Sequence, residues 1–515
     1  MVILIFIQVQ KQHTIPLYTL VLSYVCFAVS SFFYFSHSYD ADAFAYLTIT
    51  EQITNGNLLS LLNGYWSGLL SIVLLPLYLV CSNGIIAFEL TNLCIGLVSV
   101  LLFYKLLTAL HIQQYLNIVA SCSFGFVVSI WCMVQLNADV LFLLACMCLL
   151  YCVLTNKLFT SYWLVGNASF LYFAKSYGLF YFILLTIFLL VRSFVVNQKI
   201  SIKIVVKNIA LLLILLTGWG FALRTQYGRF TLSETSIYNN YIYKTGTVKH
   251  VLDTMPFILP KPYNYTPWDN VTTHLNSKEL LAQQSLFTSS KIKQLPQKCL
   301  QFIKYVNTSP RYGMYIIMLS ALLVWYYKKN IGGNLSLIIS SGLLFALGYI
   351  LFFVEYRYLL YSYVAFYIGI VYVANNFLTD RLLKKIYFQI IMLSLCSYIF
   401  VRWGIDAYRY KNNAESVATA KICKVLNTIK TTDTPLNYVT ETASEYNGVA
   451  WINKLKKVGG VISYKTDSIA LQNDLKKYTV TYIIVNDSTK MYKNIEKVYS
   501  KKILIDSTII LYIKN

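Results

Sequence analysis

Long apolar blocks separated by short polar stretches run from near residue 15 to near residue 404. A helix that crosses a bilayer needs roughly 20 predominantly apolar residues, and about eleven of these blocks suit that length. The pattern therefore predicts an α-helical polytopic membrane protein. The predicted spans lie near 15–36, 86–107, 116–134, 138–154, 160–177, 179–195, 208–224, 311–327, 334–354, 357–377 and 386–404.

Two longer polar stretches, 37–85 and 225–310, interrupt this series. Inside the first, Trp66–Val80 is apolar but short for a span and contains Pro76, which suits a helix lying at the membrane interface. The second holds nine Lys or Arg residues against four acids, together with many aromatic residues. It could bind a substrate, or it could pack as a lid without direct chemistry.

The tail from about 410 to 515 is too polar for the membrane and alternates helix-like with strand-like runs. Such alternation predicts a small α/β domain, so we expect a membrane domain at 1–405 and a second domain at 406–515. The helix-like runs are Glu415–Lys430, Glu445–Lys457 and Ser468–Lys477. The strand-like runs are Leu436–Thr440, Val461–Tyr464, Val480–Val485, Lys502–Ile505 and Ile509–Ile513.

The charge distribution sets the expected orientation. The chain is 57% hydrophobic and only 12% charged, with a net charge of +22. The basic residues do not cluster as nucleic-acid binding requires; many lie in alternate short loops, as the positive-inside rule predicts for cytoplasmic loops. The N-terminus is then cytoplasmic, and 37–85, 225–310 and the tail are extracytoplasmic. The residues that set this orientation are Lys105, Lys157, Arg192, Lys199, Lys203, Lys207, Lys328, Lys329, Arg381, Lys384 and Lys385.

The eleven cysteines suggest neither a disulfide framework nor a zinc site. Most lie inside apolar blocks, where cysteine acts as a small core residue, and no CxxC pair exists.

Candidate chemistry begins directly after the first span, where Asp40 and Asp42 are spaced i, i+2. Two such carboxylates can hold a metal ion, or one can serve as a general base for a nearby hydroxyl or amine. The structural alternative is that Asp40 caps the following helix and Asp42 favours its first turn.

The first outer loop resembles a known family. Asp42 with Tyr46 four residues on, a short helix, Asn55-Gly56 and then Gly64-Tyr65-Trp66-Ser67 are similar to the GT-C glycosyltransferases. The branch with protein O-mannosyltransferases and lipid A aminoarabinose transferases is the most similar. The resemblance implies sugar transfer from a polyprenyl-phosphate donor on the outer face of the membrane. It further implies that Asp42 is the catalytic base, that Asp40 assists or holds a cation, and that Tyr46, Tyr65 and Trp66 bind substrate.

This sequence departs from the branch at two positions. Asp42 is followed by Ala43, where many members have a second acid, and Tyr65-Trp66-Ser67-Gly68 stands where they have a proline pair.

A second acidic and basic segment, Glu355-Tyr356-Arg357-Tyr358, begins the tenth predicted span and resembles an acid-Arg-Tyr segment of many GT-C members. An arginine there can grip a phosphate bidentately. By the resemblance, Arg357 binds the donor phosphate, while Glu355 and Tyr358 bind substrate. The alternative is an interfacial charge pair anchored by tyrosines.

Two further cations are candidates for the donor phosphate. Lys175 lies near the outer end of the fifth span, and an ionisable residue at membrane depth is a functional candidate, although lysine can also snorkel to the interface. Arg224, near the start of the second long loop, could add positive charge or could simply flank a helix end.

We therefore expect a glycosyltransferase, with a lipid or glycan flippase or transporter, or an inactive GT-C-like assembly partner, as alternatives. The expected partners are a polyprenyl-phosphate-linked sugar, a glycan, lipid or protein acceptor, and the bilayer, with no nucleic acid. The sequence points to no certain cofactor, and a divalent metal at Asp40 and Asp42 stays open. By analogy we expect a bacterial inner membrane. The sequence does not specify the sugar, the acceptor or the stereochemical course.

Overall fold

The computed structural model describes two compact units of the chain. Unit 1 comprises 1–36, 89–214 and 289–411, and unit 2 comprises 37–88, 215–288 and 412–515. The described residues within them are 14–35, 41–195, 201–235, 238, 264–274, 296, 300, 332–350, 356–377, 414–429, 437–440, 447–457, 473, 475–486, 499, 501–504 and 509–513. Two predicted spans (311–327 and 386–404), the boundary between 405 and 406, and the strand Val461–Tyr464 lie outside them.

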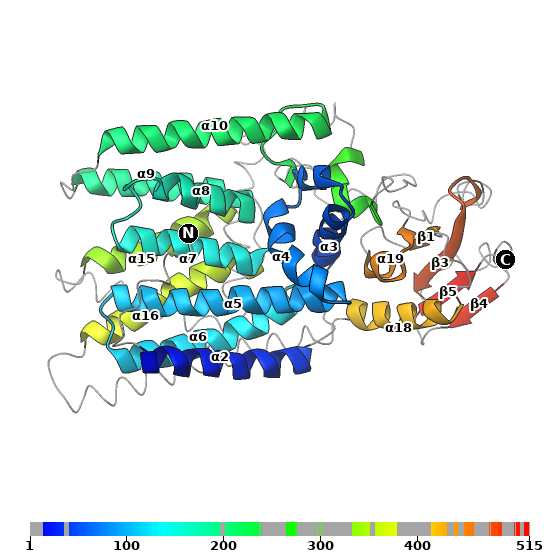
Figure 1. The fold of residues 1–515 in the computed structure, drawn as a ribbon, viewed down its shortest axis with the longest axis horizontal. Coiled ribbons are helices and arrows are strands. Elements are labelled where there is room, and N and C mark those ends of the chain that lie inside the picture. Colours follow the sequence, from blue (N-terminus) through cyan, green and yellow to red (C-terminus); the bar gives the residue numbers. More distant parts are fainter. Residues whose placement is uncertain are drawn as a thin grey trace. The chain divides into compact units, whose positions relative to one another are not determined.

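Unit 1 is a bundle of apolar helices (Figure 1). Six described helices are long and apolar enough to cross a membrane, and the chain is an integral membrane protein. Nine predicted spans coincide with helices that the structure describes, seven of them wholly in this unit. The total of about eleven stays a prediction. The helices are α2 (Thr14–Phe35), α6 (Gln114–Val134), α7 (Asp139–Leu154), α8 (Trp163–Ala174), α9 (Tyr177–Val195), α15 (Gly332–Ile350), α16 (Leu360–Phe377), most of α5 (Gly84–Ala109) and the first half of α10 (Ile202–Tyr227).

Close packing and polar contacts hold neighbouring helices of unit 1 together. The Tyr24 hydroxyl of α2 donates a hydrogen bond to the Leu93 carbonyl of α5 at 2.8 Å. Gly96 lies so close to this tyrosine that an added Cβ would collide with the hydroxyl oxygen. In α5 and α6, the rings of Phe103 and Phe124 stack with centroids 4.5 Å apart. Because lipid supplies no hydrophobic drive between helices, such contacts carry much of the association.

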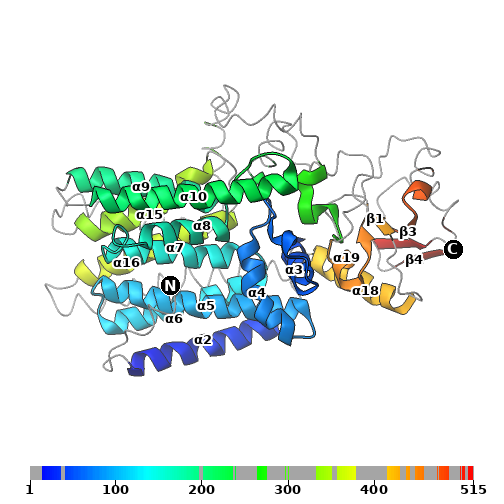
Figure 2. The same cartoon turned by 45° about the horizontal axis from the view of Figure 1, so that its top comes forward.

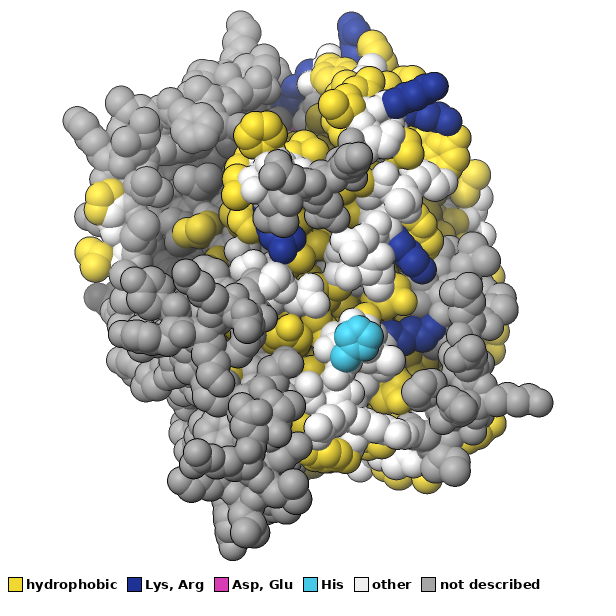
Figure 3. Space-filling view, turned by 90° about the vertical axis from the view of Figure 1, so that its left-hand side faces the viewer, with side chains coloured by type: hydrophobic (Ala, Val, Ile, Leu, Met, Phe, Trp, Pro, Cys, Tyr) yellow, Lys and Arg dark blue, Asp and Glu magenta, His cyan; other side chains and the backbone are white. Residues whose placement is uncertain are grey.

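The loops 110–113 and 155–162 and the helix ends beside them lie at one end of the unit 1 bundle. Figure 3 shows this face: among its coloured residues it carries Lys, Arg and His side chains and no Asp or Glu. Near the loop 155–162, the Lys207 Nζ donates to the Tyr162 hydroxyl at 3.0 Å. Those of the predicted cytoplasmic loops that the structure describes thus meet at one end of the helices.

Unit 2 contains the first outer loop and the C-terminal domain (Figure 2). Its helical elements are α3 (Ala41–Thr54), η2 (Leu58–Leu61), α4 (Gly68–Val80), η4 (Pro267–His274), α18 (Ala414–Ile429) and α19 (Asn447–Asn453). The helix expected at Trp66–Val80 is therefore present as α4.

The C-terminal domain of unit 2 is a five-stranded sheet in the order β2-β1-β3-β5-β4, with helices α18 and α19 packed on it. The strands β2, β1 and β3 run parallel, and β5 pairs antiparallel with both β3 and β4. The strands are β1 (Asn437–Thr440), β2 (Lys456–Lys457), β3 (Val480–Asn486), β4 (Lys501–Leu504) and β5 (Ile509–Ile513). Four of the five predicted strands are thus described, close to their expected positions.

One boundary in this domain differs from the prediction. The helix expected to run from Glu445 to Lys457 ends at Asn453, and Lys456–Lys457 is a strand. Lys454 has φ +53°, a left-handed conformation that stops a helix, and the Leu455 N–H closes the end on the Ala450 carbonyl at 2.9 Å. Residues Lys456–Lys457 therefore pair with β1 as strand β2, although their sequence pattern favours a helix.

Candidate functional site

Asp42, the predicted base, is half-buried in the first turn of α3 in unit 2. A carboxylate in this turn is stabilised by the positive end of the helix dipole. Asp40, its predicted partner, lies outside the described residues. Within the part of the chain that the structure describes, no three His, Cys, Asp or Glu side chains group closely enough to hold a metal ion. A metal at Asp40 and Asp42 stays a prediction.

Tyr46, one turn after Asp42, is buried in an aromatic cluster of unit 2. Its ring meets that of Trp66 edge-to-face, with centroids 5.5 Å apart. Tyr65, Tyr238 and Trp268 complete the cluster, and the Trp66 indole N–H donates to the Trp268 carbonyl at 3.1 Å. The structure therefore brings together three of the residues predicted to bind substrate, and Trp66 and Tyr46 are only 7% and 5% exposed.

The turn that carries Tyr65 and Trp66 is built by local polar contacts. The Asn63 Oδ1 accepts hydrogen bonds from the backbone N–H groups of Tyr65 and Trp66, each at 2.9 Å. The side chain of Asn63 thus replaces a backbone turn, as asparagine commonly does. The Gly64 N–H donates to the Tyr227 hydroxyl at 3.0 Å.

Gly64 also packs closely against Glu234, which follows α10 in the chain. Its carbonyl receives the Glu234 N–H at 2.8 Å, and an added Cβ would lie 2.8 Å from the Glu234 Cγ. The fully buried Glu234 pairs with Arg229 at 2.5 Å. Arg229 is therefore engaged in fixing this turn, whereas Arg224 is exposed on the last turn of α10, where a cation complements the helix dipole.

Unit 1 holds a separate polar cluster around Lys175, which directly follows α8. The Lys175 Nζ donates to the Asp139 Oδ1 at 2.5 Å and lies 4.3 Å from the centroid of the Tyr358 ring. Asp139 begins α7 and is only 5% exposed, while the Lys175 side chain is 28% exposed. An ion pair and a cation–π contact therefore hold one ammonium group in place.

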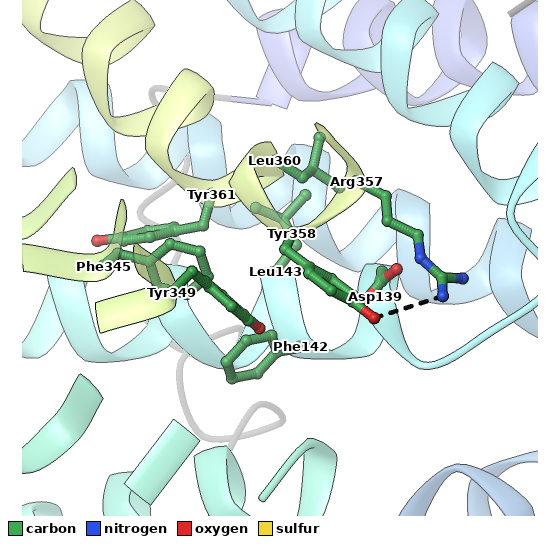
Figure 4. Close-up of a pocket in the computed structure, with 9 residues that line it drawn as sticks. All are labelled: Asp139, Phe142, Leu143, Phe345, Tyr349, Arg357, Tyr358, Leu360 and Tyr361. Atoms are coloured by element: carbon green, nitrogen blue, oxygen red, sulfur yellow. Dashed lines mark hydrogen bonds between the residues drawn. The ribbon is translucent and has the colours of Figure 1, made fainter. Parts of the chain in front are cut away.

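Arg357 reaches the same tyrosine. It lies in η6 (Tyr356–Leu359), with its guanidinium carbon 5.2 Å from the Tyr358 ring centroid. Its Nη2 donates to the Tyr358 hydroxyl at 3.4 Å, the contact dashed in Figure 4. Two predicted phosphate-binding cations thus converge on Tyr358. Glu355 lies outside the described residues.

A small cavity lies beside this cluster and is lined by Asp139, Phe142, Leu143, Phe345, Tyr349, Arg357, Tyr358, Leu360 and Tyr361 (Figure 4). Tyr349 stacks on Tyr358, with ring centroids 5.0 Å apart and planes 11° from parallel. Among the described residues, the Asp139 Oδ2 and the Tyr349 hydroxyl are buried without a hydrogen-bond partner. Because unsatisfied buried polar groups are costly, this wall of the cavity is suited to a polar ligand or water.

Asp139 is the residue of this cluster that the sequence analysis missed. Its signal was an acid at the start of an apolar block, in Asn137-Ala138-Asp139, because ionisable residues at membrane depth are usually paired or functional. The predicted residues fall in two groups: Lys175, Arg357 and Tyr358 in unit 1, and the remaining described ones in unit 2. Those in unit 2 are Asp42, Tyr46, Tyr65, Trp66 and Arg224.

Solved structures share this architecture at low sequence identity. ArnT from Cupriavidus metallidurans bound to undecaprenyl phosphate is 9% identical, with 96% of this chain and 97% of that chain covered and a TM-score of 0.50. This chain has a GT-C fold. The fold implied by the resemblance of the first outer loop is thereby confirmed.

Two further structures match with lower TM-scores. ArnT from the same organism in the apo state is 12% identical, covers 95% of this chain and 97% of that chain, and gives a TM-score of 0.40. The oligosaccharyltransferase of Archaeoglobus fulgidus tethered with an acceptor peptide is 10% identical. The match covers 94% of this chain and 70% of that chain, with a TM-score of 0.41. No protein-family model and no curated protein matches the sequence.

Proposed function

We propose that this chain is a membrane glycosyltransferase that moves a sugar from a polyprenyl-phosphate donor to an acceptor on the outer face of the membrane. The observation that carries the proposal is the convergence of Lys175 and Arg357 on Tyr358, beside a small cavity that Arg357 and Tyr358 help to line. Fixed cations at membrane depth suit a lipid-linked phosphate. The GT-C fold, shared with an ArnT that was crystallised with undecaprenyl phosphate, supports this ligand class.

In the proposed reaction, Asp42 accepts the proton of an acceptor hydroxyl or amine. The acceptor atom forms a bond to the anomeric carbon, and the bond from that carbon to the phosphate oxygen breaks. Polyprenyl phosphate leaves with the electron pair, and Lys175 and Arg357 offset its growing negative charge. Charge stabilisation by preorganised cations is usually the largest contribution to such a rate. Arg224 remains a proposed further contact to the donor phosphate. The proposed substrate contacts are Tyr46, Tyr65, Trp66, Glu355 and Tyr358.

A lysine ammonium has three N–H donors, so Lys175 can keep its bond to Asp139 and still donate to a phosphate oxygen. An arginine offers a planar fork that matches two phosphate oxygens. The pair therefore supplies one cation held in position by Asp139 and one with bidentate geometry. We assign the donor phosphate to this pair.

We also propose the orientation and the membrane. In this proposal the basic end of the unit 1 helices faces the cytoplasm, the N-terminus is cytoplasmic and the C-terminus is extracytoplasmic. The membrane is proposed to be a bacterial inner membrane, and the fold match to ArnT from Cupriavidus metallidurans supports this assignment.

The test is sugar transfer by purified protein in lipid, with a panel of polyprenyl-phosphate sugars and membrane extract as acceptor. We expect transfer by the wild type and its loss, by on the order of 10²-fold or more, in Asp42→Asn and Lys175→Met. Lys207→Met is the matched control, because Lys207 also lies over a tyrosine ring, 4.9 Å from the centroid of Tyr162. Unchanged transfer in Asp42→Asn would refute the assignment of Asp42 as the base. Absence of transfer by the wild type from every donor tested would refute the proposed glycosyltransferase activity.

A further inference from the structure

Helix α3, which carries Asp42, presents two distinct faces. Phe44 and Glu51 are seven residues apart and therefore lie on one face of α3, two turns from each other, because successive residues turn by about 100°. Asp42 precedes Phe44 by two residues, about 200° around the helix, and so lies on the opposite face. A segment that packs against the face with Phe44 and Glu51 therefore does not cover the face that carries Asp42.

The C-terminal domain supplies such a partner in α19, which lies beside α3 in unit 2 (Figures 1 and 2). The Trp451 ring packs on Phe44, with centroids 6.1 Å apart and planes at 40°. Trp451 is 8% exposed, and a Cβ added to Gly84 would come within 2.7 Å of its ring. The indole is therefore wedged between α3 and the start of α5.

Three residues after Trp451, Lys454 contacts the other end of the same face. Its Nζ lies 2.9 Å and 2.8 Å from the two carboxylate oxygens of Glu51. The same Nζ lies 4.3 Å from the Trp451 ring centroid and 5.0 Å from that of Tyr265. Lys454 makes these contacts from a left-handed backbone conformation that favours glycine.

Glu51 is also held from a third segment. The Tyr265 hydroxyl donates to the Glu51 Oε1 at 3.1 Å, and the Tyr265 carbonyl accepts the Lys457 N–H at 2.9 Å. Next to it, the Gln52 Nε2 donates to the Asn264 Oδ1 at 3.0 Å. Helix α3 is thus tied to residues more than 200 and 400 positions away in the sequence.

We infer that Trp451 and Lys454 are positioning residues, through which the C-terminal domain holds α3 and thereby orients Asp42. This inference rests on the proposed function of Asp42. Neither residue touches reacting atoms; each acts by fixing the helix from behind. The domain is then part of the catalytic apparatus and not only an appendage of the membrane bundle.

The experiment uses two single variants, Lys454→Met and Glu51→Gln, and one double variant that swaps the charges, Glu51→Lys combined with Lys454→Glu. For each variant, steady-state sugar transfer and amide hydrogen exchange of residues 41–54 are measured. Methionine keeps much of the lysine stem but removes its charge. We expect Lys454→Met and Glu51→Gln to lower kcat on the order of tenfold, with the donor KM nearly unchanged. Hydrogen exchange of the α3 amides should be faster in both single variants. The charge-swapped double variant should restore both kcat and the slow hydrogen exchange of α3. Lys477→Met is the matched control, because Lys477 lies 5.2 Å from the ring centroid of Tyr478 in the same domain.

Protection of the β3 amides from hydrogen exchange reports whether the C-terminal domain remains folded. The Glu51→Gln variant leaves that domain unaltered, because it changes only the α3 side of the contact. Unchanged kcat and unchanged α3 exchange in both single variants would overturn the inference. A wild type that transfers no sugar would refute the proposed function alone. In that case, raised α3 exchange in both single variants would still support the coupling, and unchanged exchange would overturn it.

Discussion

The Lys175 ammonium and the Asp139 carboxylate form an ion pair 2.5 Å long between the residue that follows α8 and the first turn of α7. Asp139 is buried and Lys175 is partly buried, and removing charges from water is costly unless they attract each other in good geometry. Here the Tyr358 ring adds a further contact to the cation at 4.3 Å. The ammonium is therefore held in place within unit 1 without a substrate, which is the preorganisation that phosphate binding requires.

The first prediction concerns this pair. Lys175→Met should weaken binding of undecaprenyl phosphate at least tenfold, on the order of 1.4 kcal/mol. Asp139→Asn should weaken it less, because the ammonium remains but is no longer oriented. The double variant should fall short of the sum of the two losses, since the residues act as one unit. Binding by microscale thermophoresis checks this, and additive losses would contradict it.

Arg357 provides a test of bidentate binding. Arg357→Lys keeps the charge but loses the planar fork, so we expect lower donor affinity by about 1 kcal/mol or more. Arg224→Lys is the comparison, because Arg224 is exposed at a helix end where a point charge suffices. The donor KM in the transfer assay measures both. Equal effects in the two variants would argue against a bidentate role for Arg357.

Trp66 allows packing to be separated from substrate binding. Trp66→Ala should destabilise unit 2 by about 3–5 kcal/mol, because it empties a buried aromatic cluster. Trp66→Phe keeps most of the volume and loses the indole hydrogen bond to Trp268, which should cost about 1–2 kcal/mol. Thermal unfolding in detergent measures stability beside donor and acceptor KM. A raised KM in a normally stable Trp66→Phe would instead support direct substrate contact.

Cys423 predicts a pH dependence of the C-terminal domain. Burial raises the pKa of its thiol from 9.0 to about 11. Between those pH values the folded domain keeps a proton that the unfolded chain has lost, so stability falls as pH rises from about 9 to about 11. The loss should be on the order of 2 kcal/mol. Unfolding of wild type and Cys423→Ala across this range measures the difference. Parallel pH profiles would show that the thiol does not contribute.

The proposed orientation predicts which exposed positions a membrane-impermeant maleimide reaches in intact spheroplasts. Asn55→Cys, in the loop after α3, should react without permeabilisation. Thr160→Cys, in the basic loop between α7 and α8, should react only after permeabilisation. The wild type supplies the background from native cysteines. The reverse pattern would invert the orientation and place Asp42 on the cytoplasmic side.

Apolar periodicity and length were sufficient to predict α2, α5, α6, α7, α8, α9, α10, α15 and α16, because each helix satisfies its own backbone groups in lipid. The strands β1, β3, β4 and β5 were also predictable from their β-branched and aromatic runs. The strand β2 was not, since only two residues pair and their sequence continues a helical pattern. Pairing with β1, a contact distant in sequence, decided it.

By itself, the sequence determined the membrane class, the positions of many helices, and the candidates Asp42, Lys175 and Arg357, because residue type and local spacing encode these. Only the tertiary structure decided their partners. Asp139 meets Lys175 across 36 residues, and Lys454 meets Glu51 across 403. Likewise, Trp66 became a buried neighbour of Trp268. Contacts at such separations depend on how helices and strands pack together, and no local pattern of polar and apolar residues specifies them.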